Sequence, residues 1–255
     1  MAEPPKTAEP PHAGLPWQTC LDVEGQRAGH YADVPSANLF LAFAEAPRRV
    51  LELGCSTGAF GAELKSRYPG ASVVGIDAGR EAAAVAAKRL DRVICARIEE
   101  LDLGAAGFAH GEFDMVVAAD ILEHLVNPWE VLVRLRPFLA PGAQVIASIP
   151  NVRNALLMVE LAVNGRWRYR ERGLLDITHL RFFTLEEIKR MLAETGYRHE
   201  YHICNLTPEL HSLYHGSEGR ETMNLHAGRF AISGVTRDEL AELCAEQFFV
   251  RARPA

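Results

Sequence analysis

The sequence has few cysteines, no excess of positive charge and no long apolar run, and each absence excludes a class of protein. Its five cysteines show no Cys-x-x-Cys spacing, so neither a zinc knuckle nor a disulfide framework is predicted. The formal net charge of −6 argues against a general nucleic-acid binder, because neutralising phosphates requires surplus Lys and Arg. No segment approaches the roughly 18 apolar residues that a membrane helix needs. We expect no metal, no nucleic-acid partner, no membrane span and a reducing, cytoplasmic location.

Length and composition favour one α/β domain. With 255 residues, of which 48% are hydrophobic, the chain can bury one substantial core. Residues 1–16 are rich in Pro, Ala and Glu and contain no continuous apolar segment, which predicts a flexible tail and no signal peptide. We therefore expect a single domain over residues 17–255.

From Val50 onward, short apolar segments alternate with helical ones. This pattern is typical of a doubly wound, mostly parallel sheet that is covered on both faces. The predicted strands are 49–53, 72–77, 92–96, 113–119 and 144–148. The predicted helices are 57–68, 81–90 and one that Asn127 caps and Pro128 starts. Further along, we expect helices at 152–163 and after the capping boxes at Thr184 and Thr236, and a last strand near 248–250.

The first strand runs into a turn punctuated by glycines, Glu52-Leu53-Gly54-Cys55-Ser56-Thr57-Gly58. Glycine leaves room for a ligand to approach the backbone closely. No Gly-Lys-Ser or Gly-Lys-Thr follows, and the spacing differs from Gly-x-Gly-x-x-Gly, so the sites of P-loop and dinucleotide proteins are disfavoured. A cationic cofactor without phosphate fits better, although a strand, turn and helix of this kind occur in many doubly wound proteins.

This stretch resembles the first motif of the class I S-adenosylmethionine-dependent methyltransferases, and later motifs follow in the expected order over roughly residues 30 to 205. The resemblance implies a seven-stranded sheet with one antiparallel strand and S-adenosylmethionine as the cofactor. It also divides the chain into a cofactor-binding half at about 48–150, an acceptor-side insertion at about 151–183 and C-terminal helices and strands at 184–255. Within the insertion, Leu175-Asp176-Ile177-Thr178-His179-Leu180-Arg181-Phe182-Phe183-Thr184 resembles a signature of methyltransferases from polysaccharide and secondary-metabolite pathways.

The resemblance also implies how the cofactor is bound, at the carboxyl ends of the strands. Asp77 would accept hydrogen bonds from the ribose hydroxyls, unless it only caps the next helix. At the end of the third strand, relatives often carry a Gly-Asp pair, whereas this sequence has Arg97 nearby. The expected adenine contacts are therefore Ile98, as an apolar wall, and Glu99. Main-chain atoms of the glycine turn would face the methionine part, and Glu52 would orient its amino group. The implied cofactor-binding residues are Glu52, Gly54, Cys55, Gly58, Asp77, Ala78, Ile98, Glu99, Asp120 and Ile121.

Two histidines are candidates for removing a proton from the methyl acceptor. His124 follows the fourth strand in Asp120-Ile121-Leu122-Glu123-His124, which resembles the fourth motif of the family, and it is either a base or a structural residue. His179 lies in the insertion, whose polar residues either shape the acceptor pocket or form a buried hydrogen-bonded cluster. His211 and His215 are four residues apart, but no acidic or cysteine partner stands near them at metal-ligand spacing.

Arginine occupies every second position from Arg166 to Arg172. In an extended segment these side chains would share one face, which is either a docking surface for an anionic acceptor or a solvated edge. We therefore expect methyl transfer to a small-molecule or glycan-type acceptor, anionic in one interpretation and modified at oxygen. A SAM-binding module without activity and a nicotinamide-dependent oxidoreductase are the alternatives.

Overall fold

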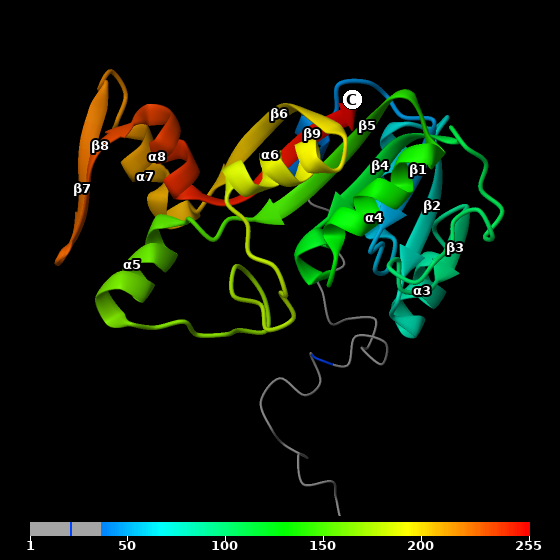
Figure 1. Cartoon of the computed structure of the whole chain (residues 1–255), viewed down its shortest axis with the longest axis horizontal. Helices are drawn as coiled ribbons and strands as arrows, with labels where there is room; N and C mark the ends of the chain where they lie inside the picture. Colours follow the sequence, from blue (N-terminus) through cyan, green and yellow to red (C-terminus); the bar gives the residue numbers. More distant parts are fainter. Residues whose placement is uncertain (1–20, 22–36) are drawn as a thin grey trace, which may run out of the picture.

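A computed structural model describes residue 21 and residues 37–255, so the predicted tail at 1–16 lies outside the described residues. Seven strands form one sheet in the order β3-β2-β1-β4-β5-β9-β6, with β9 antiparallel to both of its neighbours and the remaining neighbours from β3 to β5 parallel (Figure 1). This confirms the predicted fold class. The strands of this sheet are β1 (Arg49–Leu53), β2 (Ser72–Asp77), β3 (Arg92–Cys95), β4 (Phe113–Ala119), β5 (Leu139–Pro150), β6 (Tyr197–Leu206) and β9 (Ala245–Pro254).

Alternate residues of the central strands point to opposite faces, and both faces are buried. Leu51 and Val74 belong to the larger apolar cluster on one face, whereas Val50 and Val73 belong to the cluster on the other. Strands buried on both sides are nearly continuous in hydrophobicity. The helical segments that accompany the sheet are η1 (Ala37–Ala42), α2 (Ala59–Arg67), α3 (Arg80–Ala86), η2 (Leu122–His124), α4 (Pro128–Leu135), η3 (Arg136–Phe138) and α6 (Leu185–Glu194).

The two layers of helices have separate partners. The helices α4 and α6 contact each other over one face of the sheet (Figure 1), and residues of both enter the larger cluster. The segments η1 and α2 contribute to the cluster on the opposite face, where Phe40 stacks on Phe60 with ring centroids 4.7 Å apart. As predicted, α4 starts at Pro128, and the side chain of Asn127 accepts a hydrogen bond from the backbone N–H of Glu130.

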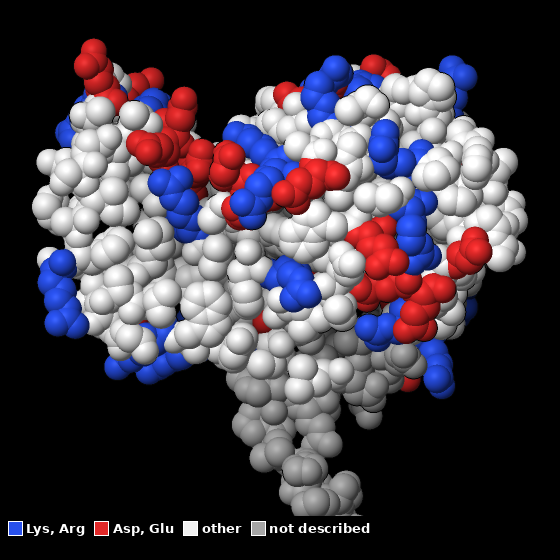
Figure 2. Space-filling model, viewed as in Figure 1, with Lys and Arg blue, Asp and Glu red and all other residues white. Residues whose placement is uncertain are grey.

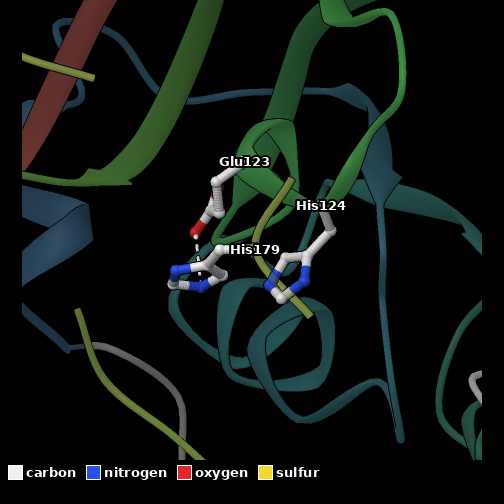
Figure 3. Close-up of side chains that lie close together, drawn as sticks. All are labelled: Glu123, His124 and His179. Carbon is white, nitrogen blue, oxygen red and sulfur yellow. Dashed lines mark ion pairs between the residues drawn. The ribbon is translucent and has the colours of Figure 1, made fainter. Parts of the chain in front are cut away.

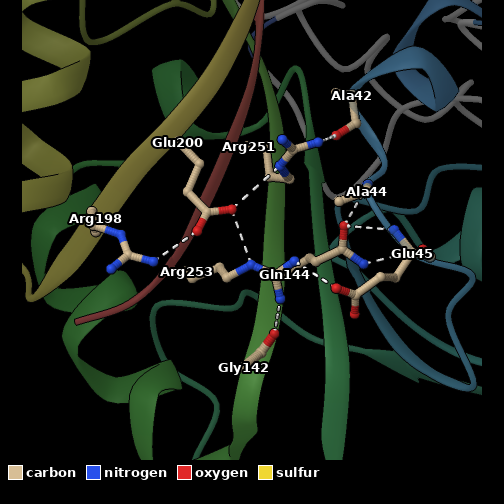
Figure 4. Close-up of polar contacts among 9 residues, drawn as sticks. All are labelled: Ala42, Ala44, Glu45, Gly142, Gln144, Arg198, Glu200, Arg251 and Arg253. Carbon is tan, nitrogen blue, oxygen red and sulfur yellow. Dashed lines mark hydrogen bonds and ion pairs between the residues drawn. The ribbon is translucent and has the colours of Figure 1, made fainter.

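Polar contacts tie β9 to β6 and β5, and tie β5 to the segment that follows η1 (Figure 4). Glu200 on β6 faces Arg251 and Arg253 on β9, with N···O separations of 3.4 Å and 3.0 Å. Gln144 on β5 accepts a hydrogen bond from the backbone N–H of Ala44 at 2.7 Å. The side chains of these ion pairs are 15 to 21% exposed, and the contacts help to fix the register of the antiparallel strand.

A second group of elements extends from one end of the sheet and contains a hairpin in a segment where no strand was predicted (Figure 1). Its core joins α8 to the hairpin through Val235, Leu240 and Leu243. The predicted capping box at Thr236 is present in full. These elements are α5 (Ala155–Asn164), η4 (Pro208–Leu210), α7 (His211–His215), β7 (Thr222–Ala227), β8 (Phe230–Thr236) and α8 (Arg237–Cys244).

Two buried asparagines connect this group to the sheet. Asn151 donates hydrogen bonds from Nδ2 to the carbonyl oxygens of Glu242 and Ala245, at 2.7 Å and 3.0 Å. Asn154 caps α5 by accepting from the N–H of Leu156, and its Nδ2 also donates to the Ala245 carbonyl oxygen. The junction between β5, α5 and β9 is therefore held at the sheet end where the first strands also finish.

The arginine-rich stretch of the insertion is not a strand. Only Arg170 makes a β-bridge there, to Asp176, and residues 166–169 have no regular structure. This stretch therefore does not join the main sheet. On the side of the molecule in Figure 2, basic and acidic side chains are interspersed, so that side offers no continuous basic surface.

Candidate functional site

A cavity of about 690 Å³ opens at the carboxyl ends of β1 and β4. The strand order reverses between these two strands, and such a reversal is where doubly wound sheets bind ligands. The volume lies in the range of small-molecule and cofactor sites. Its lining includes Gly54, Asp77, Ala78, Ile98, Glu99, Asp120, Ile121, His124 and His179 from the sequence prediction.

The turn after β1 gives the cavity its floor, and three of its residues, Gly54, Ser56 and Gly58, have positive φ. Gly54 has φ +65°, and a Cβ there would lie 2.8 Å from Cδ1 of Ile121. Ser56 has φ 46°, and Asp120, which follows β4, has φ 49°. This left-handed conformation is unfavourable for any residue that carries a side chain. Strain of this kind is typical of functional sites.

Asp77 joins the turn after β1 to the turn before α3 at one side of the cavity. Its Oδ2 accepts from the N–H of Ser56 at 2.7 Å, and its Oδ1 accepts from the N–H of Gly79 at 2.8 Å. Burial raises the pKa of this carboxyl group, and the two backbone hydrogen bonds oppose that rise. Each oxygen uses one lone pair on the protein, so each can accept one more hydrogen bond. The residue thus caps the turn before α3 and also presents acceptors to a ligand.

Glu52, Cys55 and Gly58 do not line the cavity. Burial, and then the charge of Asp77, raise the pKa of Glu52 to about 8, and its carboxyl group accepts from the N–H of Gly61 in α2. A Cβ on Gly75 would lie 2.6 Å from Sγ of Cys55, so that thiol packs against β2. A Cβ on Gly58 would meet Ala86 and Leu90 at 3.1 Å. These three residues support the turn from beneath.

The position of Arg97 is explained by its acidic neighbours. It lies 3.9 Å from Oε2 of Glu99 and 3.4 Å from Oε1 of Glu100. Glu99 also accepts from the backbone N–H of Asn127 at 3.0 Å. The guanidinium is thus neutralised at the cavity rim, beside Ile98, which forms an apolar wall with 7% exposure.

The opposite end of the cavity brings the two candidate histidines together. The rings of His124 and His179 lie 4.7 Å apart between centroids, with planes at 75° (Figure 3). The backbone N–H groups of Leu180 and Arg181 donate to the carbonyl oxygen of Glu123, which holds the insertion over η2. Residues 55 positions apart in sequence therefore form one group at the cavity wall.

Hydrogen bonds fix the tautomer of His124. The hydroxyl of Thr178 donates to Oδ1 of Asp176 at 2.6 Å, which uses its only hydrogen. The same oxygen lies 2.9 Å from Nδ1 of His124, so Nδ1 must be the donor and Nε2 keeps its lone pair. Burial, and then the neighbouring His179, lower the pKa of His124 to about 4. From the sequence, the polar residues of the insertion were expected either to line a pocket or to form a buried hydrogen-bonded cluster. Asp176 and Thr178 do both, since they line the cavity and are hydrogen-bonded to each other.

Several lining residues were missed by the sequence analysis. Glu123 precedes His124 directly, and its place in the Asp120 to His124 motif was a usable signal. Burial raises its pKa well above the ordinary value, and the charge of Asp120 adds to the rise. Glu246 and Gln247 reach the cavity from the start of β9. Only the antiparallel return of that strand brings them there, and no local pattern reports it.

Comparison with known proteins places the chain in a family. A methyltransferase domain family matches residues 24–202. The chain belongs to this family. A ubiquinone biosynthesis O-methyltransferase of Psychrobacter arcticus is 30% identical over 158 residues, which are 60% of each chain. A demethylmenaquinone methyltransferase of Thermus thermophilus is 36% identical over 107 residues, 42% of this chain and 49% of that protein. The chain thus spans about half to three fifths of these relatives.

Solved structures share the fold. A SAM-dependent methyltransferase of Archaeoglobus fulgidus superposes with a TM-score of 0.56 at 17% identity, over 84% of this chain and 89% of that one. The family match supports S-adenosylmethionine as the cofactor, and the cavity has the volume of a cofactor site and two carboxylates, Asp77 and Asp120, in its lining. Among the described residues, no helix is long and apolar enough to cross a membrane.

Proposed function

We propose that the protein transfers a methyl group from S-adenosylmethionine to a hydroxyl oxygen of a small-molecule or glycan-type acceptor. One observation carries the proposal: a single cavity joins the turn after β1, with Asp77 and Asp120, to the paired histidines of η2 and the insertion. One end suits a nucleoside cofactor, and the other can take a proton from an acceptor.

The residues at the cofactor end have distinct tasks. Asp77 would accept hydrogen bonds from the ribose hydroxyls, and Ile98 would cover the adenine. Gly54 admits the methionine part, and Asp120 faces the sulfonium side. The cofactor supplies an electrophilic methyl group. Aligning the acceptor oxygen with that group is the main work of the protein.

At the acceptor end, His124 keeps Nε2 unprotonated because Thr178 and Asp176 hold its other nitrogen in the donor state. Nε2 can therefore accept the acceptor's proton or support its removal. Arg172 lines the same cavity, which favours an acceptor that carries a carboxylate or phosphate. The O-methyltransferase name of the Psychrobacter relative supports oxygen as the atom that is methylated.

The first test is calorimetric titration of the protein with S-adenosylmethionine and S-adenosylhomocysteine, repeated on Asp77→Ala. Hydrogen bonds to a charged group contribute about 1.5 to 3 kcal/mol each, so losing one should weaken binding at least tenfold. Asp91→Ala is the matched control. Asp91 accepts from the N–H of Val73 at 2.8 Å, at the opposite end of β2, and does not line the cavity.

Tight binding by the wild type and by Asp91→Ala, with loss in a folded Asp77→Ala, supports the cofactor assignment. Wild-type affinity in Asp77→Ala would contradict it. The acceptor is then sought by following a labelled methyl group from the cofactor into hydroxylated carboxylates, phosphorylated sugars and neutral phenols. Faster transfer to the anionic acceptors that slows in Arg172→Ala supports the anionic class, and equal rates with neutral analogues would contradict it.

A further inference from the structure

The carboxyl group of Glu123 is the most isolated polar group near the cavity. Its side chain is 1% exposed, and neither carboxylate oxygen has a hydrogen-bond partner among the described residues. Burying a carboxylate without a partner is costly. A cation bound beside the carboxylate would neutralise its charge.

Two histidine nitrogens lie beside this carboxylate. Nε2 of His179 is 3.9 Å from Oε1 of Glu123, and ligand atoms of Glu123, His124 and His179 all lie within 4.8 Å of one another. Figure 3 shows the three side chains converging, two from η2 and one from the insertion. All three residues line the cavity.

The other nitrogen of each ring is already engaged as a donor. Nδ1 of His124 donates to the Thr178 hydroxyl, which in turn donates to Asp176. Nδ1 of His179 lies 3.3 Å from the carbonyl oxygen of Leu174, which can only accept. Histidines that bind a metal almost always use their second N–H in this way, which fixes the ring and leaves one lone pair for the metal.

We propose that Glu123, His124 and His179 bind a divalent transition-metal ion. Two imidazole nitrogens and one carboxylate suit zinc, manganese, cobalt or ferrous iron, whereas magnesium prefers oxygen ligands. This part of the inference rests on the proposed function: the ion would bind the hydroxyl oxygen of the acceptor and lower its pKa, so that the proton is released to solvent water. His124 would then bind the ion instead of accepting that proton.

The sequence analysis expects no metal because these ligands have no recognisable spacing: Glu123 and His124 are adjacent, and His179 arrives from the insertion. The exposed pair His211 and His215, with rings 6.0 Å apart on α7, is a competing cation site. A test must remove it first.

The experiment is a titration of the full chain, treated with EDTA and carrying His211→Ala and His215→Ala, with Co²⁺ followed by visible absorption. We expect one Co²⁺ per chain. Glu123→Gln should abolish the signal, while Thr178→Val, which only removes the hydroxyl that orients His124, should weaken affinity by about 10- to 100-fold. Thermal unfolding of each variant without metal reports whether it is folded.

Two results would overturn the inference: no Co²⁺ bound by the His211/His215 variant, or unchanged binding in folded Glu123→Gln and Thr178→Val. If Glu123→Gln does not fold, the inference is tested by comparing Co²⁺ affinity between the His211→Ala/His215→Ala protein and its Thr178→Val variant. S-adenosylhomocysteine titration of the EDTA-treated protein separates this inference from the proposed function. If the protein binds Co²⁺ but not S-adenosylhomocysteine, only the proposed function is contradicted. If it binds S-adenosylhomocysteine but not Co²⁺, only the metal site is contradicted.

Discussion

The substitution Gly54→Ala tests whether the turn after β1 forms the cofactor site. Gly54 has φ +65°, where an L-residue costs about 1 to 2 kcal/mol. The new Cβ would also lie 2.8 Å from Cδ1, 3.0 Å from Cγ1 and 3.2 Å from Cβ of Ile121, so the whole Ile121 side chain must move. Because Ile121 lines the cavity, this movement changes the space that the cofactor would fill.

The chain offers a matched control in Gly111. This glycine has φ +72°, and an added Cβ would meet nothing within 4 Å. Gly111→Ala therefore carries the same backbone cost without the displaced side chain. The backbone cost alone should remove about 1 to 2 kcal/mol of stability from each variant, which lowers Tm by roughly 2 to 8 °C for a chain of this size. Gly54→Ala should lose more, because its Cβ also displaces Ile121.

Only Gly54→Ala should lose cofactor affinity. The displaced Ile121 side chain would take space from the cavity, and we expect this to weaken cofactor binding by about tenfold, on the order of 1.4 kcal/mol. Calorimetry with S-adenosylhomocysteine measures the affinity, and thermal unfolding measures the shared backbone cost. Wild-type affinity in Gly54→Ala, or an equal loss in Gly111→Ala, would refute the argument.

Two further changes test the packing around the site. The pKa of Glu52 is raised in the folded state to about 8 from an ordinary 4.5, so its contribution to stability is complete below pH 4.5 and is lost as pH rises towards 8. Glu52→Gln should therefore gain stability relative to the wild type over that window, by about 1.4 kcal/mol per pH unit in urea unfolding, and a difference that does not vary with pH would contradict the assignment. Asn151→Ala removes three hydrogen bonds at the junction of β5 with β9, at about 1 kcal/mol each, and should lower Tm by roughly 6 to 12 °C. Asn164→Ala, which loses one exposed contact, should change Tm little, and equal shifts in the two variants would count against the junction.

The sheet was predictable where strands are buried on both faces. Strands β2 and β4 have the predicted bounds, since each is an apolar run closed by polar residues. Helix ends were less predictable. Helix α3 was predicted to end at residue 90 but ends at Ala86. The backbone N–H groups of Lys88 and Arg89 donate to carbonyl oxygens three residues earlier, so the chain leaves the α-helical pattern there. The hairpin of β7 and β8 was missed although Thr222–Ala227 alternates polar and apolar residues, a pattern typical of a half-buried strand.

Part of the candidate site was also predictable from the sequence, and part was not. Asp77 and Asp120 lie at strand ends, and a parallel sheet gathers those ends along one edge, so their convergence follows from the fold class. The side-chain direction within the turn does not follow from it: Glu52 and Cys55 belong to the motif, yet both point beneath the cavity. A motif fixes the path of the backbone, while neighbours such as Gly61 and Gly75, which leave space, decide where a side chain goes.

The acceptor end depends on contacts that only the folded insertion makes. Asp176 and Thr178 fix the tautomer of His124 from 52 and 54 positions further along the chain. The insertion is in turn held by the carbonyl oxygen of Glu123, whose carboxyl group has no hydrogen-bond partner among the described residues. A change that releases the insertion would therefore disturb the two histidines and Glu123 together, yet leave the turn after β1 intact. Cofactor affinity and acceptor chemistry should thus respond independently to mutations at the two ends of the cavity.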